Sequence, residues 1–445
     1  MPLIDAEPVI HVGVLDGVRS LSVNLHGLFD VGGEIAASGE VRVEPGDKCL
    51  LLKDVEGKEL ARGTELTCRS AQNAPFLLRD VVIGVRFHWE RKEDQVFLGN
   101  LLIRQRPDGS MAAINEIGLE DYLKSVISSE MSASCPAELL RAHAITSRSW
   151  LVAMLMREQQ VHAPPAGDAA TAGGDEIVRW YTREDHDLFD VCADDHCQRY
   201  QGISRIISSG VSDAVDATRG QFLVYGDEIC DARFYKACGG LTENFRTAWE
   251  NIDVPYLRTV SDGPVTFASI GTEEDAAKWL NSKPEAYCNT RDADILRRIL
   301  PSFDQETVDF FRWTVTYERE ELEELIRTKA GIDLGTLREL VPLERGPSGR
   351  LTRLRIVGSK RTVVIGKELE IRRWLSRSHL YSSAFVVETE RSMNGDVLRF
   401  VLRGGGWGHG VGLCQIGAAV MAVRGASADD IVTHYFRGAA LKKLY

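Results

Sequence analysis

The sequence lacks the marks of several large protein classes. No stretch approaches the ~20 apolar residues that span a bilayer, and residues 1–10 show no basic segment followed by an apolar core. No run of basic residues resembles a nucleic-acid-binding tail, and the net charge is −12. Nine cysteines, an odd number spread thinly, do not form a disulfide framework. We expect a soluble chain with no nucleic-acid partner and no transmembrane segment or visible signal peptide; a mature form stripped of its signal would look the same.

Catalytic signatures of two common hydrolase classes are also missing. The chain has no Gly-x-Ser-x-Gly elbow and no His-Glu-x-x-His helix, which removes the simplest serine-hydrolase and zinc-protease interpretations. It has no internal repeat or low-complexity tract, so solenoids and propellers are excluded. Its 445 residues, 44% of them apolar, are ordinary for a globular protein of two or three domains.

Apolar spacing predicts a β-rich start and then helices. Short alternating segments such as Leu21–Leu25 occupy residues 9–87. From Ile117 the spacing becomes helical, which predicts one helix that ends near Glu130 and a longer helix from Ala137 to about Arg157. The two helices are expected to form a corner with Glu130 at the bend.

The later part of the chain alternates between loops, helices and strands. Residues 162–174 have the composition of a loop. Helical patterns dominate residues 269–331, and strand alternation returns at Leu351–Ile356 and Thr362–Ile365. This block predicts a separate α/β lobe.

Two His and two Cys residues lie within twelve positions, at His186, Cys192, His196 and Cys197. Zinc favours nitrogen and sulfur ligands in tetrahedral sites, and four ligands from one loop would leave no open position. The spacing therefore favours a structural zinc site. The alternative is an acidic loop with chance His and Cys residues, because the usual paired Cys-x-x-Cys spacing is absent.

A glycine-rich segment near the C-terminus contains six glycines in the nine positions 404–412. Glycine allows the backbone to approach a ligand closely, so Trp407 and His409 in this segment suggest a sugar-stacking ring and a hydrogen-bonding side chain. No Lys-Ser/Thr follows to make a phosphate-binding loop. The alternative is a tight β-turn crossing in which His409 is merely packed.

Glu130 is a candidate general acid. A solvated glutamate at a helix end is the default interpretation, but Glu130 follows an apolar helix face and precedes Met131. His143 and Arg148 on the next helix are expected to face it across the corner. A Cys/His hydrolase built on Cys414 or Cys238 is a weaker interpretation, because buried cysteines commonly act as small apolar residues.

Several separate motifs, in order, resemble the stage II sporulation protein D family, which includes the amidase-enhancer proteins. They are Leu119–Leu123 through Met131, Ala142–Arg148, Phe234–Gly240 with Thr242, Glu243 and Trp249, Leu257–Val260, and Gly406–Gly412 with Gln415 and Gly417. Gly349, Arg350 and the segments 372–375 and 382–385 also resemble the family's later lobe. The resemblance covers most of the chain. Departures are Cys414, where relatives often have Ser or Thr, and Thr146 and Ser147 in place of a small apolar pair.

The resemblance implies a lytic transglycosylase that cuts peptidoglycan glycan strands lacking stem peptides, with Glu130 as the catalytic acid and base. Ordinary glycosidases need two carboxylates. In a lytic transglycosylase the C6 hydroxyl of N-acetylmuramic acid attacks its own C1, so one glutamate suffices and the product is a 1,6-anhydro sugar. The family's zinc-binding members share the His, Cys, His-Cys order, which implies that His186, Cys192, His196 and Cys197 hold a structural zinc. A zinc hydrolase would need an open coordination position that such a shell lacks.

We therefore predict an α+β fold with a β-rich N-terminal region over 1–110, a catalytic core with the zinc loop over 111–265, a second α/β lobe over 266–395, and a Gly-rich loop and C-terminal helix over 396–445, around a central glycan-binding cleft. Glu130 is the predicted catalytic residue, and the predicted glycan-binding residues are Arg148, Tyr235, Trp249, Trp407 and His409. The partners are peptidoglycan glycan strands and a cell-wall amidase, and the substrate implies an extracytoplasmic location. The competing function is a non-catalytic peptidoglycan-binding module that enhances an amidase.

Overall fold

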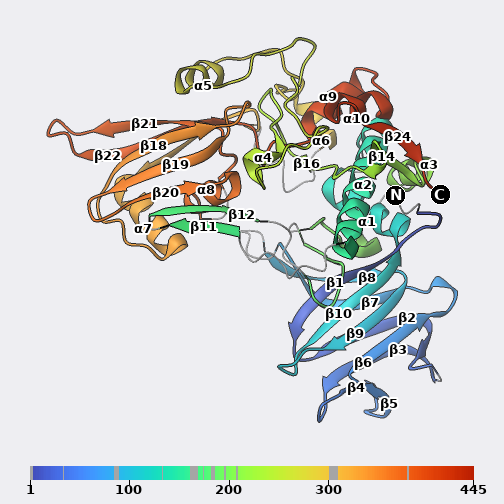
Figure 1. The fold of residues 1–445 in the computed structure, drawn as a ribbon. Helices are drawn as coiled ribbons and strands as arrows, with labels where there is room; N and C mark the ends of the chain where they lie inside the picture. The colour runs from blue at the N-terminus through green and yellow to red at the C-terminus, as the bar shows by residue number, and fades with distance from the viewer. Residues whose placement is uncertain are drawn as a thin grey trace. The chain divides into compact units, whose positions relative to one another are not determined.

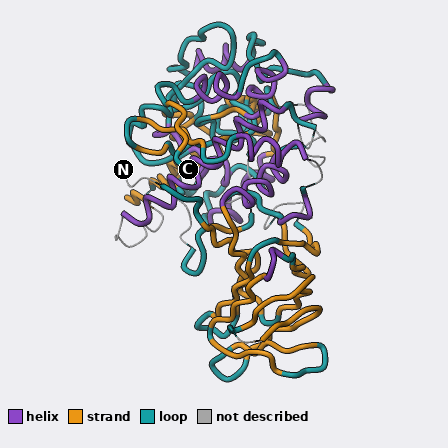
Figure 2. Tube along the Cα trace, turned by 90° about the vertical axis from the view of Figure 1, so that its right-hand side faces the viewer, coloured by secondary structure: helices purple, strands orange, loops and turns teal. Residues whose placement is uncertain are grey.

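The computed structural model describes residues 4–33, 35–84, 90–132, 134–160, 169–173, 175–181, 186–194, 197–206, 209–299, 309–377 and 380–445. By packing, the chain divides into two units, each built from separate stretches of sequence (Figures 1 and 2). Unit 1 comprises residues 1–133, 183–221 and 443–445, and unit 2 comprises residues 134–182 and 222–442. The sequence analysis divides the chain into four regions that follow one another along the sequence, and that division stays a prediction.

Unit 1 is dominated by an eleven-stranded sheet with the order β13-β1-β10-β9-β6-β2-β3-β4-β5, in which β7 pairs with β2 and β8 (Figure 1). The strands are β1 Val9–Val18, β2 Leu21–Val31, β3 Ile35–Pro45, β4 Leu50–Asp54, β5 Glu59–Gly63, β6 Glu65–Ser70, β7 Phe76–Ile83, β8 Arg91–Phe97, β9 Asn100–Gln105, β10 Met111–Gly118 and β13 Val191–Cys192. Alternate residues of β2, such as Leu21, Val23 and Leu25, are buried, as expected for a sheet with one face against a core.

The helices of unit 1 are α1 Leu119–Glu130 and α3 Ser209–Ala217, with short 3₁₀ turns η1 Ala71–Asn73 and η2 Gly202–Arg205. Helix α1 forms because its apolar residues recur at helical spacing and its first turn carries Glu120 and Asp121, which suit the positive helix N-terminus. It ends where Met131 turns to an extended backbone and donates its N–H to the Ile127 carbonyl. The predicted helix end at Glu130 is confirmed.

Unit 2 contains a five-stranded sheet, two three-stranded sheets and one two-stranded pair, with the orders β11-β12-β20-β19-β18, β17-β22-β21, β15-β14-β24 and β16-β23. The strands are β11 Ala169–Gly173, β12 Glu176–Trp180, β14 Gln221–Tyr225, β15 Glu228–Ile229, β16 Phe234–Tyr235, β17 Arg312–Glu318, β18 Leu337–Arg345, β19 Leu351–Gly358, β20 Thr362–Gly366, β21 Phe385–Arg391, β22 Val397–Gly405, β23 Leu413–Cys414 and β24 Ala440–Lys443. The strands predicted near 351–356 and 362–365 are confirmed as β19 and β20.

The helices of unit 2 are α2 Ala137–Gln160, α4 Phe245–Ala248, α5 Glu273–Leu280, α6 Ala293–Ile299, α7 Arg319–Ala330, α8 Glu368–Trp374, α9 Gln415–Val423 and α10 Ala428–Tyr435. Buried residues of α7, α8, β17–β22 form one apolar core, which includes Leu322, Ile356 and Phe400. Helices α9 and α10 pack against each other and against α2 (Figure 1).

The fold is α+β as predicted, with 26% helix and 37% strand. One local prediction is wrong: of residues 162–174, expected to be a loop, Ala169–Gly173 form β11. They do so because they pair antiparallel with β12, with Ala169 opposite Trp180. Among the described residues, no helix combines the length and apolar character needed to cross a bilayer.

Candidate active site and metal loop

Glu130 is the last residue of α1, in unit 1, and its side chain is only partly buried. Its Oε1 accepts a hydrogen bond of 3.4 Å from the backbone N–H of Arg199. The carboxylate is therefore held by a segment almost seventy positions later in the chain. This arrangement leaves an acid that is oriented by the backbone and still exposed to solvent.

The segment that orients Glu130 is fixed by aromatic packing. The Tyr200 ring stacks between Tyr122 of α1 and Phe97 of β8, with centroid distances of 5.1 and 5.9 Å. The Tyr200 hydroxyl donates to Asn115 Oδ1, and the Gln201 N–H donates to Ser125 Oγ. Buried rings and satisfied polar groups resist displacement, so the Arg199 N–H has a defined position beside Glu130.

The loop that carries the predicted zinc ligands, here called the metal loop, lies directly before this segment. His186 Nε2 and Cys197 Sγ are 3.5 Å apart, and one donor atom each from His186, Cys192 and Cys197 lie within 4.8 Å of one another. His196, the fourth predicted ligand, lies outside the described residues. One nitrogen and two sulfur donors at this separation fit three corners of a tetrahedral zinc site.

The loop is attached to the sheet through β13, which runs parallel to β1 with Val191 opposite Val12. Phe189 packs so closely over Gly13 that a Cβ at Gly13 would lie 2.5 Å from the ring. Only glycine allows this approach. The loop is thus anchored to β1 between His186 and Cys197, and by Tyr200 after Cys197.

In unit 2, the structure brings Tyr235, Trp249 and His409 together. The His409 ring lies 5.2 Å from the Tyr235 ring and 4.9 Å from the Trp249 ring, both edge-on. The Arg233 guanidinium lies 3.7 Å from the Trp249 ring centroid. Trp249 and His409 are partly exposed, whereas Tyr235 is buried. The cluster offers aromatic surface and hydrogen-bonding groups of the kind that bind sugars.

His409 is a neutral hydrogen-bonding group in this setting. Burial, together with the positive charges of Arg233, Arg372 and Arg350, lowers the pKa of His409 well below its usual value. The Val411 N–H donates to Nδ1 at 3.1 Å, which assigns the proton of the neutral ring to Nε2. The ring also makes a hydrogen bond with the Phe234 backbone, so His409 is held in place within the cluster and is poorly suited to carry a charge.

Two other predicted residues have different surroundings. The Trp407 ring contacts Tyr381 and Phe310, with centroids 4.4 and 5.0 Å away. Arg148, on α2, is completely buried. His143, on the same helix, is also buried, and desolvation together with the charge of Lys236 lowers its pKa to about 3.

Sequence reasoning did not assign a site role to Arg350 or Glu243, which organise the glycine-rich segment from within. Arg350 is fully buried and donates to the Gly408 carbonyl, the Cys238 carbonyl and Ser348 Oγ. Ser348 Oγ in turn donates to Glu243, whose pKa is raised by burial. A Cβ at Gly410 would lie 2.4 Å from Arg350 Cζ. The glycine at position 410 is thus required by a buried guanidinium. Arg350 and Glu243 both lie in motifs of the family resemblance.

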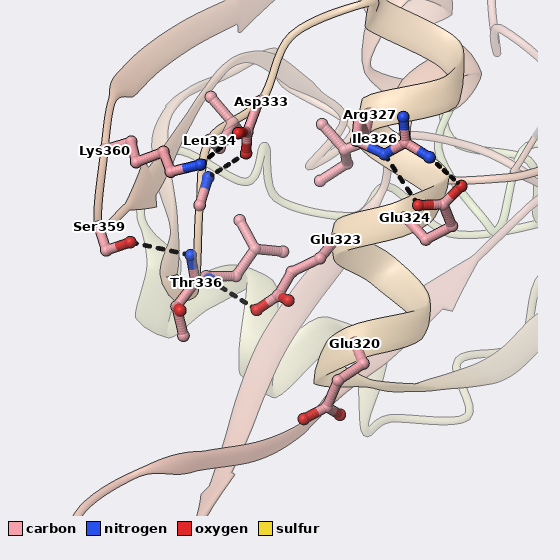
Figure 3. A pocket seen from close by; sticks show the side chains of 12 residues that line it. Glu320, Glu323, Glu324, Ile326, Arg327, Asp333, Leu334, Thr336, Ser359 and Lys360 are labelled. Carbon is pink, nitrogen blue, oxygen red and sulfur yellow. Dashed lines mark hydrogen bonds and ion pairs between the residues drawn. The ribbon is translucent and has the colours of Figure 1, made fainter.

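Unit 2 has a surface pocket. It is lined by α7 and by the turns before β18 and β20, with Glu323, Thr336 and Lys360 in its wall (Figure 3). Its polar groups bond to one another, as Glu323 accepts from the Leu337 N–H and Ser359 Oγ accepts from the Thr336 N–H. None of its lining residues belongs to the predicted site.

Comparison with known proteins adds two family matches. Residues 107–225 match the Stage II sporulation protein model, and residues 243–412 match a domain of unknown function. The first match contains Glu130 and the metal loop.

Individual relatives are similar over about three quarters of the chain. The chain is 24% identical to stage II sporulation protein D of Bacillus subtilis (strain 168) over 74% of this chain and 76% of the relative. It is 26% identical to stage II sporulation protein D of Bacillus amyloliquefaciens over 73% and 74%, respectively. It is 23% identical to the amidase enhancer of Bacillus subtilis (strain 168), over 72% of this chain but only 40% of the enhancer.

Proposed function

Because the chain belongs to the stage II sporulation protein D family, we propose that it is a lytic transglycosylase acting on peptidoglycan glycan strands. The relatives support a cell-wall-related role. The observation that carries the finer proposal is the Glu130 carboxylate, which is partly exposed and hydrogen-bonded to the Arg199 N–H.

The proposed reaction needs one carboxyl group with two successive roles. Glu130 gives its proton to the glycosidic oxygen as the bond from C1 to that oxygen breaks. The resulting carboxylate then takes the proton of the C6 hydroxyl as the C6 oxygen bonds to C1. Proton and electron pairs balance without water, and the products are a 1,6-anhydro end and a new free hydroxyl. A second carboxylate, needed to activate water in ordinary glycosidases, has no part in this reaction.

We propose that His186, Cys192 and Cys197, with His196 as the fourth ligand, hold a structural zinc ion. When bound, the ion would cross-link the loop and leave no coordination position for substrate. Cys197 is two residues before Arg199, so closing the loop would fix the N–H that orients Glu130. This assigns the metal a positioning role.

We assign glycan contact to the partly exposed rings of Trp249, Trp407 and His409, with Tyr235 supporting His409. Glu130 belongs to unit 1 and these residues to unit 2. Arg148 is assigned a role inside unit 2, because its side chain is completely buried. A site on the cell wall also implies an extracytoplasmic location.

The second candidate is a peptidoglycan-binding enhancer of a cell-wall amidase, which the match to the amidase enhancer favours. The two candidates differ in whether glycan strands are cut. Incubating the full chain with glycan strands freed of stem peptides, and analysing the ends by mass spectrometry, separates them. We expect 1,6-anhydro ends. Binding without products would establish the enhancer, and reducing ends without anhydro sugars would establish a hydrolase; either result overturns the proposed transglycosylase.

A further inference from the structure

A second cluster of potential metal ligands lies inside unit 2, far from the loop of unit 1 in sequence. Cys238, Asp262, Cys288 and Cys414 each contribute one donor atom, and the four atoms lie within 4.8 Å of one another. All four residues are buried, with at most 3% of their surface exposed. Burying three thiols and a carboxylate around one point is costly unless something compensates the charged or polar atoms.

The distances in this cluster are those of a compact coordination shell. Cys238 Sγ lies 3.4 Å from Cys288 Sγ and 3.2 Å from Asp262 Oδ2. Sulfur atoms bound tetrahedrally at ~2.3 Å from one zinc ion would be about 3.8 Å apart. The observed spacing is therefore close to the edge lengths of a tetrahedron around a single ion.

Backbone N–H groups point at the sulfur atoms. Cys414 Sγ accepts from the N–H groups of Cys238 and Gly417, at 3.3 and 3.4 Å. Cys238 Sγ accepts from the Gly240 N–H at 3.3 Å. Cys414 is also the N-cap residue of the nine-residue helix α9. At Cys414, the N–H donors and the helix N-terminus both stabilise the thiolate, the form that binds metals. Burial raises the pKa of the Cys238 and Cys288 thiols, so their thiolates need a bound cation to offset the charge.

The carboxylate has the outer contacts of a metal ligand. Asp262 Oδ1 accepts from the Tyr435 hydroxyl at 2.6 Å, and Oδ2 accepts from the Cys288 N–H at 2.9 Å. Such contacts orient a ligating group and leave Oδ2 directed toward the sulfurs. The partly buried guanidinium of Arg312 donates to the Gly239 carbonyl next to Cys238 and partly offsets the negative charge of three thiolates and a carboxylate.

We propose that Cys238, Asp262, Cys288 and Cys414 form a second, buried metal site that binds one Zn²⁺ ion and holds together the polypeptide segments of unit 2 that lie behind the glycine-rich loop. Three thiolates and one carboxylate select zinc over magnesium or calcium, which prefer oxygen ligands. Four protein ligands complete the tetrahedron, so the ion is structural. This inference goes beyond the proposed function and does not depend on it.

The test is metal analysis of the full chain, purified under reducing conditions with zinc supplied and excess metal removed. We expect two zinc ions per chain, one in each cluster. Cys192→Ser should remove the loop ion only, and Cys288→Ser should remove the buried ion only. Cys230→Ser is the matched control, because Cys230 is a buried cysteine of unit 2 outside the cluster. It should keep both ions.

A second measurement leaves the buried cluster intact, in case Cys288→Ser does not fold. The Cys192→Ser protein, stripped with chelator and reloaded with Co²⁺, should show the near-ultraviolet thiolate-to-cobalt absorption and the visible bands of a tetrahedral ion. If that protein binds neither zinc nor cobalt, the buried site does not exist. A disulfide found by mass spectrometry between Cys238 and Cys288 or Cys414 in the purified wild type would also overturn the proposal, as would iron in place of zinc.

Discussion

The two units differ in what their candidate sites can do with a proton. Unit 1 presents Glu130, a partly exposed carboxyl group that accepts a hydrogen bond from the Arg199 backbone N–H. Unit 2 presents aromatic rings around His409, which its surroundings keep neutral. One region is suited to giving and taking protons, and the other to holding an uncharged sugar. In the proposed function, the chemical step therefore belongs to unit 1 and glycan affinity to unit 2.

Glu130→Gln is the most direct way to break this division of roles. Glutamine can still accept the Arg199 N–H bond and donate to a glycosidic oxygen, but it has no proton to give. We expect the release of anhydro ends to fall by about 10²–10⁴-fold while glycan binding is retained. Asp121→Asn, an exposed acid on the same helix, is the control and should stay near wild-type rate. Near wild-type turnover by Glu130→Gln would show that Glu130 is not the catalytic acid.

Gly410→Ala tests whether unit 2 depends on the packing of its loop around Arg350. The residue has a φ of 84°, and an added Cβ would lie 2.4 Å from Arg350 Cζ. Positive φ costs about 1–2 kcal/mol and overpacking about 1–3 kcal/mol more. Gly395→Ala has nearly the same φ, 86°, with nothing within 4 Å, and should show the first cost only. Denaturant unfolding of both variants measures the difference, and equal losses would contradict the packing argument.

Cys197→Ser sharpens the comparison by disabling the metal loop of unit 1 alone. We expect the loss of one zinc ion per chain. When the free zinc concentration is 100 times the dissociation constant, binding adds about 2.7 kcal/mol to the free energy of unfolding. Loss of the ion should lower the free energy of unfolding by about that amount. Activity should fall as well, because Arg199 loses the anchor on its N-terminal side and keeps only the packing of Tyr200. Cys49→Ser, a partly exposed cysteine of unit 1 outside the cluster, is the control. Unchanged zinc in Cys197→Ser would eliminate this site.

Acid should destabilise unit 2 through His143. The pKa of this buried histidine is lowered to about 3, whereas it is about 6.5 in the unfolded chain. The unfolded state therefore binds more protons below pH 6.5, and stability falls as pH drops from 6.5 toward 3. The slope from this group approaches about 1.4 kcal/mol per pH unit. Unfolding free energies measured between pH 6.5 and 4 should show a shallower slope in His143→Gln, and an identical slope would refute the assignment.

Trp249→Ala should give the smallest effect and only on binding. Loss of a ring that stacks on a sugar face costs about 0.5–1.5 kcal/mol beyond its buried area, which is roughly a 2- to 12-fold rise in Kd. The turnover of bound glycan should change little. A loss of turnover as large as that of Glu130→Gln, measured at saturating glycan, would place Trp249 in the chemical step and end the separation of roles between the units.

Sequence reasoning succeeded where the relevant residues are close together in the chain. The end of α1 at Glu130 was predictable because apolar spacing within a dozen residues specifies an amphipathic helix. The sequence groups Cys192 and Cys197 with His186 because one loop carries them, and their donor atoms lie within 4.8 Å of one another. That they bind zinc stays a prediction. Strand β11 was missed because its Ala and Gly residues carry no strand signal and depend on pairing with β12.

Features assembled over long distances escaped prediction. The bonds that link Cys238 to Asp262, Cys288 and Cys414 cross 24, 50 and 176 positions. No spacing rule connects such residues, and each cysteine alone is typical of an apolar core. The same holds for Arg350, whose role depends on carbonyl groups of Gly408 and Cys238 that only the fold brings near. The glycines at 406–412 indicate that another group packs closely against this backbone, but they do not identify which residue it is.

The wide spacing of the buried cluster has a consequence for the order in which unit 2 is assembled. Cys238, Asp262 and Cys288 leave the ribosome long before Cys414, so an ion held by the first three would lack its fourth ligand until the last part of the chain arrives. A chain truncated before Cys414 would keep most of its sheets but could not complete the shell. Closing a loop of this length removes much conformational freedom from the unfolded chain. The complete metal shell would thus form, and stabilise unit 2, only after the glycine-rich segment and α9 have been synthesised.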